Sequence, residues 1–187
     1  MGTNNRFSAR IVAVGAWGQE FRSWSDLQKL LENQVWQDDG AKGPKPEIIP
    51  ANERRRAPLP VRLAVESSWQ ATQQSDFEAQ DLSCVFVSAL GDTQLTDYMC
   101  KVLAGESKQL SPTKFHNSVH NAAAGYWTIS TGCMKAANSV AGYEESVSLT
   151  LLEAMTQIHI EQQPVLLTFY DAPVSKVLQS LLKNEYP

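Results

Sequence analysis

The sequence predicts a layered α/β domain with a mixed, mostly parallel sheet, and three observations support that prediction. Leu82–Leu90 is a nearly continuous apolar run whose length and β-branched content are typical of a strand buried on both faces. Glu144–Ile160 carries apolar residues at helical spacing, which indicates an amphipathic helix. Strand-like and helix-like segments alternate along the chain, and such alternation is typical of helices packed against one sheet.

The other elements follow from local patterns. Strands are expected where β-branched or aliphatic residues gather, over Phe7–Trp17 and Pro164–Tyr170. Helices are expected where apolar residues recur on one face, over Ser25–Asn33, Val61–Gln74, Gly91–Gly105 and Val174–Leu182.

Two segments are expected to lack long regular structure. Gln37–Pro60 contains several prolines and glycines, so it cannot be a continuous helix or a central strand. Ser111–Gly132 is rich in small residues, which let backbones approach closely, and is expected to be a less regular, tightly packed segment.

Size and composition limit the class of protein. The 187 residues suit a single domain over 1–187, and 43% apolar against 19% charged residues excludes a disordered chain. The net charge of -4 argues against nucleic acid as the main partner, because phosphate binding needs a basic face.

The cysteines and the chain start indicate a cellular compartment. Cys84, Cys100 and Cys133 are too few and too scattered for a disulfide framework, so free thiols in a reducing compartment are expected. Met1–Arg10 has no signal-peptide-like apolar core, and no apolar run is long enough for a membrane helix. We therefore expect a cytoplasmic protein without a membrane span.

Common cofactor and metal motifs are absent from the sequence. It has no P-loop and no dinucleotide-binding glycine pattern. His116 and His120 have the spacing of a helical metal pair, but no Glu lies between them and a third ligand is not close in sequence. We expect no metal and no cofactor. Arg54–Arg56 is either a solvated charge run, which we favour, or a site for an acidic partner or a phosphate.

One stretch resembles a known family. Asn121–Gly125, followed by Thr128-Ile129 and Gly132, resembles the segment before the catalytic cysteine in β-ketoacyl synthases of the thiolase fold. Ser118–Trp127 looks like the short branch that includes compact chain length factors of aryl polyene clusters in Gram-negative bacteria. Arg54–Arg56 before an apolar helix and Val165–Pro173 are similar to the family as well. The resemblance implies the N-terminal half of a thiolase-like fold.

The resemblance also implies that the nucleophile is missing. Carrying the family pattern forward places the nucleophile position at Glu144, or at Glu145 if the register slips by one residue. A carboxylate cannot replace the thiolate in acyl transfer, because the thiolate is the better nucleophile and forms the productive thioester. The family's catalytic histidines belong to a C-terminal half that this sequence does not contain.

These two departures are typical of a catalytically silent chain length factor. Such a subunit would form a heterodimer with an active β-ketoacyl-ACP synthase and help to shape the acyl or polyene tunnel, with acyl carrier protein bound mainly by the partner. The resemblance assigns the following candidates to the tunnel or the interface: Phe115, His116, His120, Asn121, Tyr126, Trp127, Ser139, Val140, Ala141, Tyr143 and Glu144.

Two details of this assignment can be compared with a structure. By the family pattern, Ala137–Ala141 is a short strand that pairs across the dimer axis. Glu144 would need a basic partner or helix N-terminal amides if it were buried at such an interface, whereas an ordinary helix N-terminal glutamate needs neither.

Two other functions stay open at this point. The chain would be a stand-alone acyl-thioester enzyme if Glu144 or Glu145 acted as a base, or a non-catalytic binding module of a different complex.

Overall fold

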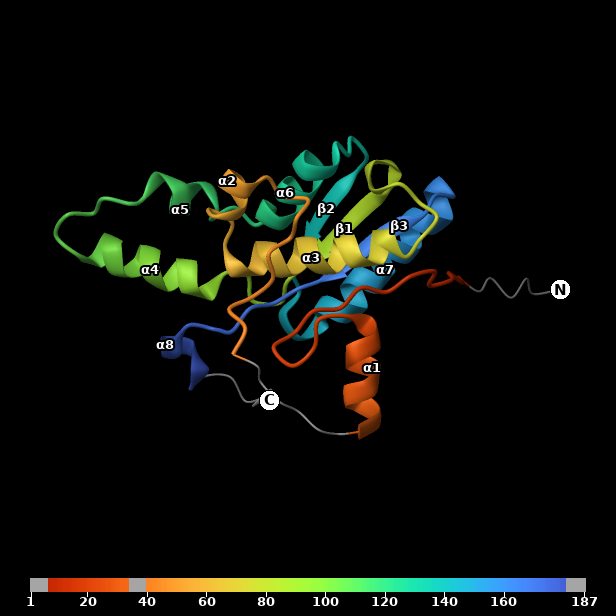
Figure 1. Ribbon diagram of the computed structural model, residues 1–187. Coiled ribbons are helices and arrows are strands. Elements are labelled where there is room, and N and C mark those ends of the chain that lie inside the picture. The colour runs from red at the N-terminus through yellow and green to blue at the C-terminus, as the bar shows by residue number, and fades with distance from the viewer. Residues whose placement is uncertain (1–6, 34–39, 181–187) are drawn as a thin grey trace.

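The computed structural model describes residues 7–33 and 40–180 (Figure 1). Within those residues, the centre is a three-stranded sheet in the order β2-β1-β3. The strands are β1 (Ser83–Val87), β2 (Ala137–Val140) and β3 (Val165–Phe169). Both strand pairs are parallel, so the predicted layered α/β fold is confirmed.

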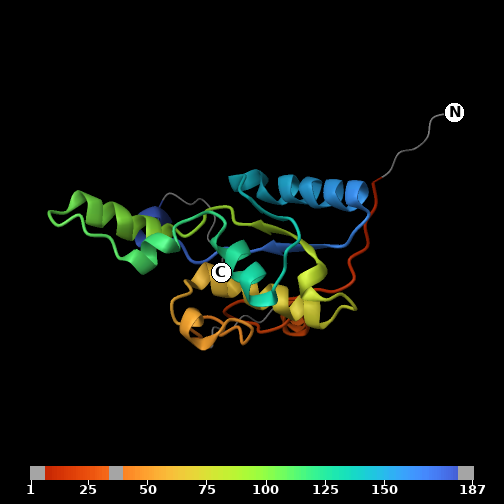
Figure 2. The same ribbon diagram turned by 90° about the horizontal axis from the view of Figure 1, so that it is seen from above.

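Helices cover both faces of this sheet. α3 (Leu59–Gln73) and α6 (Ala122–Thr131) pack together on one face, and α7 (Ser146–Glu161) covers the other (Figure 2). Because both faces are covered, all five residues of β1 are buried, as the continuous apolar run predicted.

The main core lies between α3, α6 and the sheet. Val61, Ala64 and Val65 of α3 are buried there together with Phe86 of β1. A buried hydrogen bond also crosses this layer, because Ser68 Oγ of α3 and Thr168 Oγ1 of β3 lie 2.7 Å apart. The pairing of two hydroxyls satisfies both polar groups away from water.

Two helices form an arm, defined here as residues 93–116, that projects from the sheet body in both ribbon views (Figures 1 and 2). α4 (Thr93–Ala104) begins after Asp92, whose side chain accepts a 2.9 Å hydrogen bond from the Leu95 amide, and α5 (Pro112–His116) follows the turn at the tip. Tyr98 ties the two together, since its hydroxyl accepts a bond from the Ser111 amide and its ring centroid lies 3.5 Å from Lys114 Nζ.

Shorter elements complete the described chain. They are α1 (Trp24–Asn33), α2 (Ala51–Arg54), α8 (Lys176–Gln179) and two single 3₁₀ turns over Ala79–Asp81 and Tyr143–Glu145. α1 matches the helix predicted at Ser25–Asn33. The segment before α3 is irregular apart from α2, as its prolines predicted, although residues 37–39 lie outside the described ranges.

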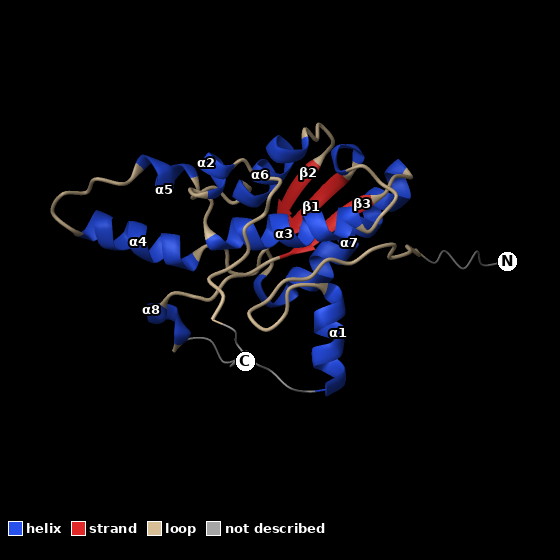
Figure 3. Cartoon of the chain, viewed as in Figure 1, coloured by secondary structure: helices blue, strands red, loops and turns tan. Residues whose placement is uncertain are grey.

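The strand predicted over Phe7–Trp17 is wrong. This segment is an unpaired loop that lies along α3 (Figure 3). A side chain at Gly15 would collide with the Ser67 carbonyl, and the Ala16 amide donates a 3.2 Å hydrogen bond to Gln70 Oε1. Side chains of α3 thus take up hydrogen bonds that a neighbouring strand would have made.

The prediction that Ser111–Gly132 is irregular is also wrong, because it contains α5 and α6. The Ala122–Ala124 run favours a helix strongly enough to include Gly125. Gly132 then ends α6 in the left-handed region, with φ 71°.

The last predicted helix, Val174–Leu182, is helical only at Lys176–Gln179, and residues 181–182 lie outside the described ranges. Among the helices that the structure describes, none combines the length and apolar character needed to cross a membrane.

Candidate functional site

The turn from β2 to α7 contains the position where the resemblance expects a nucleophile. Glu144 and Glu145 lie in the 3₁₀ turn Tyr143–Glu145, directly before α7, and both side chains are exposed. Within the described residues, neither carboxylate has a hydrogen-bond or ion-pair partner. Glu144 therefore has the environment of an ordinary exposed glutamate near a helix start.

The backbone of this turn is tight. Tyr143 has a φ of 50°, in the left-handed region that non-glycine residues seldom adopt. The Gly142 amide donates a 3.1 Å hydrogen bond to Ser146 Oγ. A Cβ atom added to Gly142 would lie only 2.6 Å from Leu149 Cδ1. The chain thus makes a sharp strand-to-helix bend at residues 142–146.

A hollow runs along the base of the arm, near the carboxyl ends of β1 and β3. It consists of two adjoining cavities of about 450 and 430 Å³, which share lining residues. We call it the arm groove. In α/β sheets, the carboxyl ends of the strands are where ligands commonly bind, because the loops diverge there.

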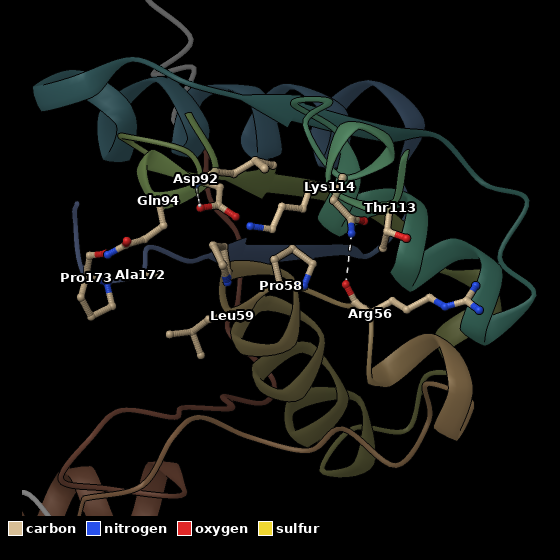
Figure 4. A pocket seen from close by; sticks show the side chains of 12 residues that line it. Arg56, Pro58, Leu59, Asp92, Gln94, Thr113, Lys114, Ala172 and Pro173 are labelled. Atoms are coloured by element: carbon tan, nitrogen blue, oxygen red, sulfur yellow. Dashed lines mark hydrogen bonds between the residues drawn. The ribbon is translucent and has the colours of Figure 1, made fainter. Parts of the chain in front are cut away.

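The first cavity of the arm groove has a mixed lining (Figure 4). Pro58, Leu59 and Pro173 provide apolar walls, while Lys114 points toward Asp92 and the Arg56 guanidinium points away from them. Arg54 is also committed elsewhere, since its Nη1 donates a 2.9 Å hydrogen bond to the Pro46 carbonyl. Arg54–Arg56 therefore does not converge on one anion site in this structure.

The arm side of the second cavity is apolar. Leu95, Met99 and Leu103 of α4 line it, together with Val119 and His120. Sequence reasoning assigned these α4 residues to a helix but not to a site. Their spacing of four residues was the signal, because it places them on one helix face.

Asn117 supports the wall shared by both cavities. Its side chain is 7% exposed; Nδ2 donates to the Arg56 carbonyl at 3.1 Å, and Oδ1 accepts a 3.2 Å bond from the Tyr126 hydroxyl. Burial is the main reason that the pKa of Tyr126 is raised, with nearby Glu53 adding to it.

The predicted site residues occupy different environments. Phe115, His116, His120 and Asn121 are exposed near the arm, and of these His120 lines the groove. Trp127 is 0% exposed in the core of this chain, and its role at a tunnel or interface stays a prediction. The remaining residues lie on β2 or in the turn after it, namely Ser139, Val140, Ala141, Tyr143 and Glu144.

His116 and His120 do not form a helical metal pair. His116 is the last residue of α5, and His120 lies in the turn before α6. In the described ranges, no group of three or more His, Cys, Asp or Glu side chains is placed to hold a metal ion.

An apolar surface lies on α7, away from the sheet. We call it the α7 face, and its exposed large side chains are Val147, Leu149, Leu151, Leu152 and Ile160. A helix that is apolar on several sides is ordinarily buried, and a large exposed apolar patch marks an interaction site.

The three cysteines lie away from the turn between β2 and α7. Cys100 is exposed on α4, where it borders the arm groove, whereas Cys84 and Cys133 are buried. Burial raises the pKa of Cys84 to about 12, which keeps this thiol protonated. The described turn therefore provides carboxylates but no thiol.

The parallel sheet with helices on both faces and the sharp strand–turn–helix bend define the class: a layered α/β domain. The family model described as "Beta-ketoacyl synthase, N-terminal domain" matches residues 23–187. The chain belongs to this family.

Solved structures share the fold. A chain in the complex of the ketosynthase ApeO with its chain length factor ApeC from Xenorhabdus doucetiae superimposes with a TM-score of 0.79 at 22% identity, covering 93% of this chain and 71% of that chain. A β-ketoacyl synthase from Burkholderia phymatum STM815 gives a TM-score of 0.63 at 13% identity, covering 82% of this chain and 44% of that chain. A search of curated protein sequences finds no match.

Proposed function

We propose that this chain is a catalytically silent ketosynthase-like subunit, a chain length factor that pairs with an active β-ketoacyl-ACP synthase in the cytoplasm. It would help to shape the tunnel for a growing acyl chain in type II polyketide, aryl polyene, biosynthesis. The observation that carries the proposal is the turn between β2 and α7, which holds exposed Glu144 and Glu145 and no thiol, at the position where the family resemblance expects the nucleophile.

The environment of the two carboxylates supports the lack of condensing activity. A ketosynthase nucleophile must form a thioester, which a carboxylate does not do productively. A carboxylate acting as a base would gain from burial or a specific partner that tunes its pKa. Glu144 and Glu145 are exposed, which favours the silent subunit over the stand-alone enzyme.

The α7 face and the free edge of β2 support an obligate protein partner. Burial of side chains such as Leu152, which is 65% exposed, would be favourable by roughly 1.5–3 kcal/mol each if fully covered. β2 is an edge strand among the described strands, so its outer backbone groups are available for pairing. The ApeO–ApeC neighbour is a ketosynthase solved with its chain length factor, which supports a ketosynthase as the partner.

The arm groove supports the part of the proposal that concerns the tunnel. Met99 and Leu103 provide an apolar wall of the kind that an acyl or polyene chain would contact. His120, Phe115 and Tyr143 remain candidates from the family pattern. Acyl carrier protein would be bound mainly by the partner.

Reconstitution tests this proposal directly. The chain is purified alone and together with a β-ketoacyl synthase encoded in the same genome, and each preparation receives acyl and malonyl carrier-protein thioesters. We expect a stable complex on size exclusion with light scattering, no turnover by the chain alone, and elongation by the complex. Glu144→Gln in the complex should leave the rate within about twofold, because an exposed carboxylate outside the chemistry adds little.

Other outcomes separate the rival functions. Turnover by the chain alone that Glu144→Gln or Glu145→Gln abolishes would establish the acyl-thioester enzyme. A monomer that ignores the synthase and leaves its products unchanged would indicate a binding module of another complex.

A further inference from the structure

Two buried thiols meet at one carbonyl oxygen. Cys84 Sγ of β1 and Cys133 Sγ, just after α6, each donate a 3.3 Å hydrogen bond to the Leu82 carbonyl. Burial, and after it the neighbouring Cys133, raise the pKa of the Cys84 thiol. Cys84 is 0% exposed and Cys133 is 4% exposed, so both thiols are shielded from water in this conformation.

The surroundings provide a route to Cys133 but not to Cys84. Cys84 lies in the central strand β1, where it is paired with Ala137 of β2 on one side and with Leu166 of β3 on the other. Cys133 follows the left-handed Gly132 and precedes Met134, which is 94% exposed. An outward movement of residues 132–135 would therefore expose the Cys133 thiol and leave the 2.8 Å hydrogen bond from the Cys84 amide to the Ala136 carbonyl in place.

We propose that Cys84 and Cys133 are a modification site, a dithiol that a hydroperoxide converts into an intramolecular disulfide. The Cys133 thiolate attacks the peroxide oxygen, giving a sulfenic acid and releasing water or an alcohol once the leaving oxygen is protonated. The Cys84 sulfur then attacks the sulfenic sulfur, and the hydroxyl leaves as water with the Cys84 proton. Overall, two thiols are oxidised by two electrons and one peroxide is reduced.

The disulfide would have a structural consequence for the arm. The cross-link between residues 84 and 133 encloses the whole arm and α6 in one covalent loop. Closing a loop of this length removes entropy from the unfolded chain, so the oxidised protein should melt about 5 to 15 °C higher than the reduced protein. This inference does not depend on the proposed function.

The experiment uses the full chain carrying Cys100→Ser, which removes the exposed thiol and keeps the buried pair. The protein is treated with hydrogen peroxide, denatured, alkylated with iodoacetamide and digested. We expect no alkylation of Cys84 or Cys133, a cross-linked peptide pair that dithiothreitol releases, and a raised melting temperature that dithiothreitol reverses.

Matched variants decide the outcome. Cys133→Ser should leave Cys84 fully alkylated after peroxide, and its circular dichroism spectrum reports whether it folds. The proposal is overturned if the Cys100→Ser protein still alkylates at both thiols after peroxide. It is also overturned if Cys133 is found only as sulfinic or sulfonic acid.

Discussion

The Tyr126 hydroxyl donates a 3.2 Å hydrogen bond to Oδ1 of Asn117, and this contact connects α6 to the base of the arm. The Asn117 side chain also contacts the segment before α3, because its Nδ2 donates a 3.1 Å hydrogen bond to the Arg56 carbonyl. The segment before α3, the end of α5 and the middle of α6 therefore meet at one buried amide. The wall between the two cavities of the arm groove depends on it.

Asn117→Ala should lower the free energy of unfolding by about 1–3 kcal/mol, because it removes two hydrogen bonds made by a buried amide, to the half-buried Tyr126 hydroxyl and to the Arg56 carbonyl. Tyr126→Phe removes one bond and should cost about 1 kcal/mol. Urea denaturation at neutral pH measures both. Asn121→Ala is the control: Asn121 is exposed and makes no side-chain capping bond, so a change below about 0.5 kcal/mol is expected. Equal losses at Asn117 and Asn121 would contradict this account.

Stability should fall between about pH 10 and pH 12, and Tyr170 is one cause. Burial, with a smaller effect from Asp171, raises the pKa of Tyr170 from 10.0 to about 12. The unfolded chain therefore loses the phenolic proton first as the pH rises, so the stability present below pH 10 is lost by pH 12. The loss is on the order of 2 kcal/mol.

Tyr170→Phe keeps the ring and removes the titrating group. Urea midpoints recorded across this pH range should therefore fall less steeply in the variant. Tyr143→Phe, at a residue that is 53% exposed, is the comparison. If Tyr170→Phe and the unaltered chain lost stability in parallel, Tyr170 would not be a source of the alkaline instability.

Leu152→Lys should separate folding from assembly. Leu152 is 65% exposed on the α7 face, so the isolated chain should unfold within about 0.5 kcal/mol of the unaltered protein. Placed in an apolar interface, the same charge should weaken association with the synthase at least tenfold, because a desolvated charge has no partner there. Ser25→Lys on exposed α1 is the matched control. Unchanged affinity for Leu152→Lys would remove the α7 face from the proposed interface.

Met99→Trp should shorten the products of the reconstituted complex. Met99 lines the arm groove, and the larger indole would occupy space that an acyl chain otherwise reaches. Product lengths are measured by mass spectrometry after release from the carrier protein. Val102→Trp, three residues on in α4 and not part of the groove lining, should leave the distribution unchanged. If Met99→Trp and Val102→Trp both gave the product lengths of the unaltered complex, the arm groove would not be part of the tunnel.

The local patterns of the sequence were sufficient for the strands and helices that pack in the ordinary way. Leu82–Leu90 predicted β1 because a strand covered on both faces must be apolar at nearly every position. The periodic apolar residues of Glu144–Ile160 predicted α7, and the family resemblance predicted the carboxylates in the turn before it.

Other features required the tertiary structure. Phe7–Trp17 has the composition of a strand, yet Gln70 and the close approach of Gly15 to α3 hold it as a loop. The complete burial of Trp127 also required the structure, because its position on α6 faces the packed layer.

By itself, the sequence determined the layered α/β class, the family and the absence of a thiol in the turn between β2 and α7. Only the tertiary structure decided which groups meet: the arm groove, the Asn117 contacts and the thiol pair at the Leu82 carbonyl. The physical reason is the sequence distance over which each kind of interaction acts. Periodicity and capping act over a few residues and are readable locally, whereas burial and hydrogen-bond pairing depend on segments brought together by packing.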